Sequence, residues 1–286
     1  MMEQMTQITD IKGSLLEGCL WDPAEEQLYF IDIEEKRIYR YKPADRALDF
    51  IPVHDYIGCI VPSGRKTLVA AIRDGLYEVS FETKKLEKIM ESPLGPDLRF
   101  NDGKCDPYGN FWLGSMLIHQ DRFEKKDQGS LYCIRDNQIL EDYRPYTIPN
   151  GLAWDEKLDV FYHIDTPKRR VDAYKVVDQS RIVERSLCLD LAEETGSPDG
   201  MCIDIEGNLW IAMWGGAKVL CYNPKSQEKL EVITVPRENV SCCTFGGEKQ
   251  NLLYLTTAAD GEQKGEVFVT ETHTQGGLVY PYIWND

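Results

Sequence analysis

Four oxygen-bearing side chains each precede a short apolar run and stand next to or near a glycine. They are Glu17, Asn101, Asn150 and Asp199. The carboxylates of Glu17 and Asp199 and the carboxamide oxygen of Asn150 form a hard, all-oxygen ligand set, which suits Ca²⁺, Mg²⁺ or Mn²⁺, with Zn²⁺ retained as a further candidate. Acidic and Asn-Gly pairs are also common turn residues, which is the alternative interpretation. We expect Glu17, Asn150 and Asp199 to bind one divalent cation.

A cationic side chain precedes one of these positions. Arg99 lies two residues before Asn101, so its guanidinium can hold a substrate hydroxyl or carboxylate while Asn101 both donates and accepts hydrogen bonds. An ordinary surface ion pair for Arg99 is the alternative. The four histidines show no metal-ligand spacing, and the sequence has no Gly-x-Ser-x-Gly motif or Ser/His/Asp constellation. These absences disfavour a nucleophilic serine hydrolase.

The elements that would position these residues recur along the chain. Six apolar runs repeat at intervals of 40 to 50 residues, the length of a four-stranded propeller blade. Their first residues are Leu28, Leu68, Phe111, Phe161, Leu209 and Leu253. A second short run follows each of them, and turn residues lie between runs at Gly109-Asn110, Gly207-Asn208, Arg73-Asp74-Gly75 and Asn223-Pro224-Lys225. The pattern predicts an all-β fold, a six-bladed β-propeller of four-stranded antiparallel blades around a central channel.

The candidate ligands stand at matched positions in this repeat. Glu17, Asn101, Asn150 and Asp199 lie 10 or 11 residues before the run of their own blade. In a pseudosymmetric ring, equivalent positions surround one axis, so we expect these side chains to meet at one end of the channel, just before the first strands. We also expect residues 5–9 to pair with the last blade and close the ring. Residues 187–195 alone have a helix-like spacing, which predicts a short helical turn.

Length and charge limit the classes of function. A chain of 286 residues with 42% hydrophobic residues can bury a large core, and we expect one propeller domain over residues 1–286. The formal net charge of −16 argues against a nucleic acid or an anionic membrane as partner and favours small molecules or cations. We expect a monomer or a weak homo-oligomer.

The cysteines and the first residues indicate the compartment. Most of the nine cysteines stand inside apolar runs without Cys-x-x-Cys spacing, which predicts reduced, buried thiols. The vicinal pair Cys242-Cys243 is the one candidate for redox activity. Residues 1–10 lack the apolar segment of a signal peptide, and no stretch approaches the ~20 apolar residues of a membrane helix. These features predict a cytoplasmic protein.

Longer motifs around the same residues resemble the gluconolactonase, regucalcin and luciferin-regenerating-enzyme family of six-bladed propellers. The matching segments are Glu17-Gly18-x-x-Trp21, Arg99-Phe100-Asn101-Asp102-Gly103-Lys104, Pro149-Asn150-Gly151-Leu152-Ala153-Trp154 and Pro198-Asp199-Gly200-Met201. The resemblance implies that Glu17, Asn150 and Asp199 bind one divalent cation and that Arg99 and Asn101 contact a sugar. It also implies that Asp199 is the general base.

The resemblance implies metal-dependent hydrolysis of a sugar lactone to an aldonic acid. The cation would polarise the ring carbonyl, and Asp199 would orient or deprotonate water, with a metal-bound hydroxide as the competing nucleophile. One departure concerns the substrate, because His119 falls where the family has a sugar-contacting Glu. A calcium-binding regulator or an interaction scaffold without turnover is the alternative function.

Overall fold

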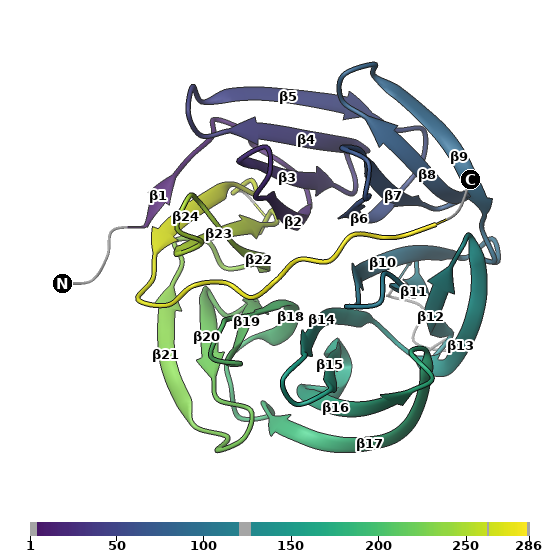
Figure 1. Cartoon of the computed structure of the whole chain (residues 1–286). Coiled ribbons are helices and arrows are strands. Elements are labelled where there is room, and N and C mark those ends of the chain that lie inside the picture. The colour runs from purple at the N-terminus through teal and green to yellow at the C-terminus, as the bar shows by residue number, and fades with distance from the viewer. Residues whose placement is uncertain (1–4, 120–126, 262, 285–286) are drawn as a thin grey trace.

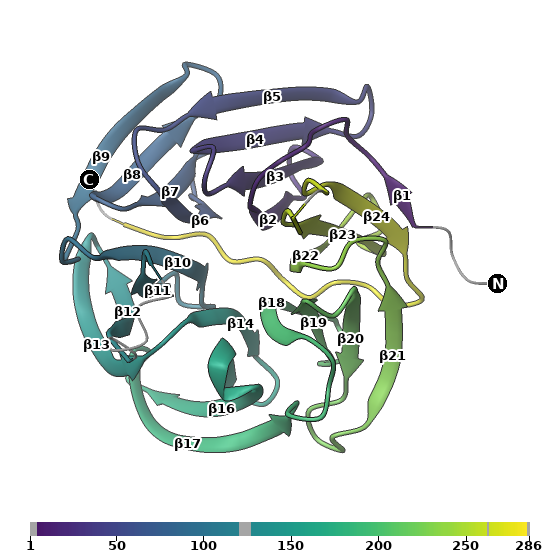
Figure 2. The same ribbon diagram turned by 180° about the vertical axis from the view of Figure 1, so that it is seen from behind.

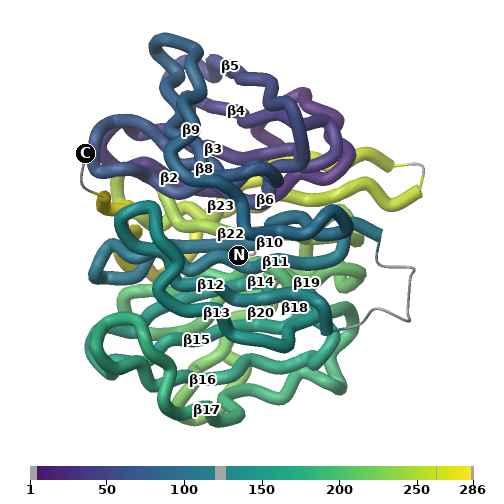
Figure 3. Tube along the Cα trace, turned by 90° about the vertical axis from the view of Figure 1, so that its right-hand side faces the viewer, coloured from purple at the N-terminus to yellow at the C-terminus, as the bar shows by residue number. Residues whose placement is uncertain are grey.

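The structure is a computed structural model that describes residues 5–119, 127–261 and 263–284. Six four-stranded antiparallel sheets are arranged as blades in a ring around a central axis (Figure 1). Figure 3 shows the ring edge-on, with the hairpin turns of the blades at its two faces. The expected all-β, six-bladed propeller is confirmed.

The strands follow one another from the axis outward in each blade. Blade 1 contains β2 (Leu16–Asp22), β3 (Gln27–Asp32), β4 (Arg37–Lys42) and β5 (Ala47–Pro52), and blade 2 contains β6 (Ile57–Pro62), β7 (Leu68–Ile72), β8 (Gly75–Ser80) and β9 (Lys85–Glu91). Blade 3 contains β10 (Leu98–Cys105), β11 (Phe111–Leu117), β12 (Gly129–Arg135) and β13 (Gln138–Tyr146), and blade 4 contains β14 (Pro149–Asp155), β15 (Val160–Asp165), β16 (Arg170–Val177) and β17 (Arg181–Asp190). Blade 5 contains β18 (Ser197–Ile203), β19 (Leu209–Trp214), β20 (Lys218–Tyr222) and β21 (Lys229–Thr234), and blade 6 contains β22 (Val240–Gly246), β23 (Leu252–Thr257), β24 (Val267–Glu271) and β1 (Thr6–Gln7).

The repeated apolar runs form the second strand of every blade. In β7 and β11 every residue is buried, because these strands are covered on both faces by neighbouring blades. The outermost strands differ, since in β13 buried or half-buried residues alternate with exposed ones along most of the strand. Removing the second strands from water provides the apolar driving force that packs the blades into a ring.

Two segments close the ring. Strand β1 pairs with β24 through Thr6 and Val269 and through Gln7 and Phe268, so the expected pairing of residues 5–9 with the last blade is confirmed. The second is residues 272–284, here called the C-terminal strap, drawn in yellow across the ring in Figures 1 and 2. Its Gly277 N–H donates to the Ile203 carbonyl at 2.8 Å, and its Tyr282 N–H donates to the Pro62 carbonyl at 2.8 Å. The strap therefore ties blade 5 to blade 2.

The predicted helical turn at residues 187–195 is wrong. Leu187 pairs with Asp172 and Leu189 with Val171 in the last part of β17. Residues 192–196 form turns and bends. The pairing partners offered by β16 override the weak helical spacing of this segment, because ladder hydrogen bonds outweigh local propensity.

All nine cysteines are free and buried, as the sequence predicts. Cys202 and Cys243 approach each other with their sulfur atoms 3.7 Å apart. Burial raises the pKa of the Cys59 and Cys105 thiols, which makes them poor nucleophiles. Within the described part of the chain, no helix is both long and apolar enough to cross a membrane.

Candidate functional site

The first strand of every blade carries a register irregularity near its start. The pairing shifts between Glu17 and Leu20, Ile57 and Cys59, Phe100 and Gly103, Pro149 and Leu152, Pro198 and Met201, and Val240 and Cys242. A β-bulge redirects the side chain at the shift away from the ladder. Asn101, Asn150 and Asp199 lie inside such shifts, and Glu17 lies at the edge of one. The candidate residues therefore stand inside the first strands and not just before them, which corrects our expectation.

The glycine that follows a candidate ligand allows adjacent blades to approach closely. A Cβ atom added at Gly151 would lie 2.6 Å from the carbonyl oxygen of Asp199, and one added at Gly200 would lie 2.8 Å from the Cα of Cys242. Contacts this short exclude any side chain. The glycines of the Asn-Gly and Asp-Gly pairs are therefore needed for close packing of the innermost strands, in addition to the turn preference that the sequence suggests.

Asn150 is held between blades 4 and 5. Its Nδ2 donates to Oγ1 of Thr166 at 3.0 Å, and the Thr166 hydroxyl donates to the carbonyl of Pro198 at 2.8 Å. Thr166 begins η2 (Thr166–Lys168), the single described 3₁₀ helix. Both Asn150 and Asp199 are buried. This network fixes the Asn150 amide beside the residue that precedes Asp199.

Arg99 and Asn101 are linked to each other and to blade 4. Nη1 of Arg99 donates to Oδ1 of Asn101 and to the Phe100 carbonyl, both at 2.9 Å. Asn101 in turn donates from Nδ2 to the Pro149 carbonyl at 2.9 Å. Burial lowers the pKa of Arg99 to about 10, although the charges of Glu17, Tyr56 and Asp199 oppose this shift. The buried guanidinium of Arg99 is therefore close enough to interact electrostatically with Glu17 and Asp199, two of the candidate ligands.

The carboxylates at this end of the channel repel one another. Removal from water raises the pKa of Glu17 to about 8, and the charge of Asp102 adds to the shift. Burial also raises the pKa of Asp199, with further contributions from Glu17 and Asp102, while a hydrogen bond from Asn150 lowers it. Three carboxylates against one guanidinium leave a formal charge of −2 when all four groups are ionised.

The formal charge of −2 on these four groups shows whether a divalent cation would suit the site. One dication would bring the group to neutrality, and the oxygen donors are of the hard type that such ions bind. Across the described residues, no group of three or more His, Cys, Asp or Glu side chains is arranged to hold a metal ion. The candidate set includes two such side chains, Glu17 and Asp199, and completes its donors with the Asn150 carboxamide. These residues fit one divalent cation.

His119 lies apart from this buried group. It follows β11, is exposed, and directly precedes residues 120–126, which lie outside the described residues. The structure brings together Glu17, Arg99, Asn101, Asn150 and Asp199 and leaves His119 at the periphery.

Sequence reasoning missed two carboxylates that support the site. Asp32 accepts hydrogen bonds from the backbone N–H groups of Ser14 and Leu15 at 2.8 and 3.2 Å. Asp165 accepts one from Ile148 at 2.9 Å. The sequence could have indicated both residues, because Phe-Ile-Asp at Asp32 and His-Ile-Asp at Asp165 each place an Asp 15 residues after a candidate ligand.

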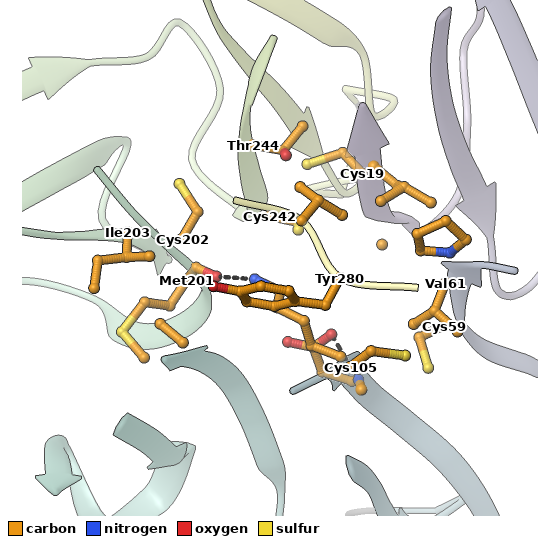
Figure 4. Close-up of a pocket in the computed structure, with 18 of the residues that line it drawn as sticks. Cys19, Cys59, Val61, Cys105, Met201, Cys202, Ile203, Cys242, Thr244 and Tyr280 are labelled. Atoms are coloured by element: carbon orange, nitrogen blue, oxygen red, sulfur yellow. Dashed lines mark hydrogen bonds between the residues drawn. The ribbon is translucent and has the colours of Figure 1, made fainter. Parts of the chain in front are cut away.

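The channel contains a cavity of about 70 Å³, shown in Figure 4, that extends from Gly18 and Asp102, close to the candidate ligands, towards the strap. Its lining includes five thiols, from Cys19, Cys59, Cys105, Cys202 and Cys242. Lys104 also lines the cavity, and its Nζ donates to the Met201 carbonyl at 2.7 Å. Residues 277–280 of the C-terminal strap form part of its wall. The strap crosses one end of the channel, whereas the candidate ligands lie at the other end.

Comparison with known proteins gives a family match. Residues 15–259 match the model of the SMP-30/Gluconolactonase/LRE-like region. A Bacillus subtilis (strain 168) protein provisionally named sugar lactone lactonase YvrE is 32% identical over 272 residues, which cover 94% of this chain and 91% of that protein. Regucalcin of Danio rerio is 29% identical over 252 residues, covering 87% and 85% of the two chains.

Solved structures share the same fold. A luciferin-regenerating enzyme superposes with a TM-score of 0.91 at 28% identity, covering 98% of this chain and all of that one. A calcium-binding protein, regucalcin, from Agrobacterium tumefaciens also gives a TM-score of 0.91, at 21% identity and 98% coverage of both chains. At that identity the second likeness concerns the fold alone.

Proposed function

The chain belongs to the SMP-30/Gluconolactonase/LRE-like family, and from this premise we propose that it hydrolyses sugar lactones in a reaction that depends on one divalent cation. The observation that carries the proposal is the convergence of Glu17, Asn150 and Asp199, beside Arg99, at one end of the channel. The reaction class is that of a carboxylic ester hydrolase, with a gluconolactone-like ring as substrate and an aldonic acid as product.

In this proposal Glu17, Asn150 and Asp199 hold the cation. When bound, it supplies a Lewis acid for the ester carbonyl. Glu17 and Asp199 carry the negative charge that offsets the cation, and Asn150 adds a neutral oxygen. The two shifted strand registers in blades 4 and 5 fix the positions of Asn150 and Asp199 before any ligand arrives, so little ordering is needed on binding.

Asp199 also has the role of base or water-orienting group. Its carboxylate accepts a hydrogen bond from a water molecule and directs one lone pair of that water at the carbonyl carbon of the ester. Ionised Asp199 is the active form, because a protonated carboxyl group cannot take the proton. Since burial and the charges of Glu17 and Asp102 raise the pKa of this group, positive charge nearby favours the active form.

Arg99 and Asn101 bind the hydroxyl groups of the sugar. Their mutual hydrogen bond at 2.9 Å holds both side chains in one orientation. The second N–H of Asn101, the second lone pair of its Oδ1 and the remaining guanidinium donors can then bind ring substituents. His119 is proposed as a third contact at the edge of the site. Its exposed position on the loop after β11 is consistent with a contact made only once substrate is bound.

A calcium-binding regulator without turnover is the second candidate, because several relatives carry the name regucalcin. One experiment separates the two. Purified protein is assayed for δ-gluconolactone hydrolysis with and without a chelator, and cation binding is measured in parallel by calorimetry. The lactonase proposal expects turnover that the chelator abolishes and added cation restores, whereas tight cation binding with no turnover above the uncatalysed rate would support the regulator.

A further inference from the structure

Lactone hydrolysis changes the charge of the bound molecule. Water adds to the ester carbonyl, the ring C–O bond breaks, and the products are an aldonate anion and one proton, so a neutral substrate becomes a negatively charged product. Arg99 and a dication beside it attract this anion more strongly than the neutral lactone. The protein therefore needs a means to weaken product binding without weakening substrate binding.

The turn between β3 and β4 lies at the same end of blade 1 as Glu17, because Leu16 pairs with Asp32 and Glu17 pairs with Ile31. Buried Asp32 fixes the start of the turn by accepting hydrogen bonds from the N–H groups of Ser14 and Leu15. Oε1 of Glu35 accepts a hydrogen bond from the Ser14 hydroxyl at 3.1 Å. The turn is thus fastened to the segment that leads directly into Glu17.

Glu34 lies in the middle of this fastened turn and is exposed. On its other side Nζ of Lys36 lies 5.2 Å from the centre of the Tyr56 ring and 3.9 Å from Oδ1 of Asp55. Among the described residues, Glu34 itself has no hydrogen bond or ion pair. Its carboxylate is nevertheless one of the groups whose charge acts on the Arg99 guanidinium, together with Glu17, Tyr56 and Asp199.

Of the three carboxylates that act on Arg99, Glu34 alone is exposed and unassigned to cation binding. Glu17 and Asp199 form the cation site, so their charge is offset when the cation is present. We infer that Glu34 is a specificity-determining residue, whose carboxylate at the rim of the site repels the aldonate product and leaves binding of the neutral lactone unchanged. This inference rests on the proposed function.

The turn also provides a matched control. Glu34→Gln and Glu35→Gln remove the same charge from neighbouring positions, but Glu35 is directed at Ser14. For a single exposed charge, we expect Glu34→Gln to bind gluconate about threefold to tenfold more tightly than the wild type at low ionic strength. The difference should disappear near 1 M salt, where the Debye length falls to ~3 Å.

The experiment measures binding of gluconate and of neutral sorbitol to the cation-loaded wild type and both variants by titration calorimetry. Tighter gluconate binding in Glu34→Gln alone, with sorbitol affinity unchanged, supports the inference. The inference is overturned if gluconate affinity changes equally in both variants, changes in neither, or remains changed in high salt. It is also overturned if none of the three proteins binds gluconate. Because the measurement requires no turnover, it remains decisive even if the wild type hydrolyses no lactone, a result that would contradict only the proposed function.

Discussion

Asp32 and Asp165 occupy the same position in blades 1 and 4, each 15 residues after a candidate ligand and each bonded to the backbone just ahead of it. Asp32 holds the N–H groups of Ser14 and Leu15, three and two residues before Glu17. Asp165 holds Ile148, two residues before Asn150. Both carboxylates are buried, at 0% and 2% exposure. Two of the three proposed ligands are thus positioned by the same device, repeated half a ring apart.

Replacing Asp32 tests this positioning role. We expect Asp32→Asn to weaken cation binding about 10- to 100-fold, the usual cost of losing a group that orients a metal ligand. The free energy of unfolding should fall by roughly 1 to 3 kcal/mol, because buried N–H groups lose an acceptor. Chelator competition and thermal melts measure the two effects. Asp142→Asn, which breaks the surface pair with Arg144, is the control. Unchanged cation affinity in Asp32→Asn would show that Glu17 is positioned without it.

Replacing Asp199 tests the cation site itself. We expect Asp199→Ala to bind less than one cation per chain and to lose kcat/KM by about 10²- to 10⁴-fold, the range for removal of a positioned base. Metal analysis and lactone hydrolysis assays provide the two readouts. Full metal stoichiometry in this variant would exclude Asp199 as a ligand.

The substitution His119→Glu tests substrate selection. A neutral imidazole offers one donor and one acceptor, whereas a carboxylate only accepts, so the pattern of sugar hydroxyls bound should change. A hydrogen bond worth about 1 to 3 kcal/mol in the transition state alters kcat/KM by about one to two decades. The assay compares gluconolactone, galactonolactone and xylonolactone. Identical rate ratios in parent and variant would place residue 119 away from the substrate.

His163 provides a prediction of pH dependence. It is 1% exposed in blade 4, and burial, aided by the charges of Lys168 and Arg185, lowers its pKa to about 3. Between pH 6.5 and 3 the unfolded chain binds a proton here that the folded protein does not, so stability falls by about 1.4 kcal/mol per pH unit on acidification. Above pH 6.5 the residue has no such effect.

The measurement compares the free energy of unfolding at pH 7.5 and pH 5. We expect wild type to lose about 2 kcal/mol more than His163→Leu over this interval. Exposed His273 is the control, and His273→Leu should retain the wild-type difference. A parallel pH response in wild type and His163→Leu would mean that His163 is protonated in the folded protein.

The sequence predicted the ring well because its signal is repeated. The anchors Leu28, Leu68 and Phe111 all fall at the start of a second strand or one residue inside it, since burial on both faces requires a continuous apolar run. The matched spacing of Glu17, Asn150 and Asp199 follows from the same repeat. Because the same pattern occurs in all six blades, the repeat length of 40 to 50 residues can be recognised in the sequence.

Other features had no local signature. The register shift that surrounds Asp199 depends on pairing between strands and not on residue type. Asp102 adds to the charge at the site only because three blades meet there. The strap has no repeat partner, and its anchor Tyr282 is buried against blades 2 and 3, more than 130 residues away in sequence. Such long-range relations require the folded ring.

The closure by β1 and the C-terminal strap has a consequence for biosynthesis. Blade 1 is synthesised before β24 and the strap, so neither closure can form until these two segments have been made. Pairings between distant segments form late, after the entropy of a long loop has been overcome. During synthesis the blades therefore form an open row in which β1 lacks its partner, and the unpaired strand edges of such a row can pair with other chains. Rapid final closure therefore limits the time in which the unpaired edges of the row are exposed.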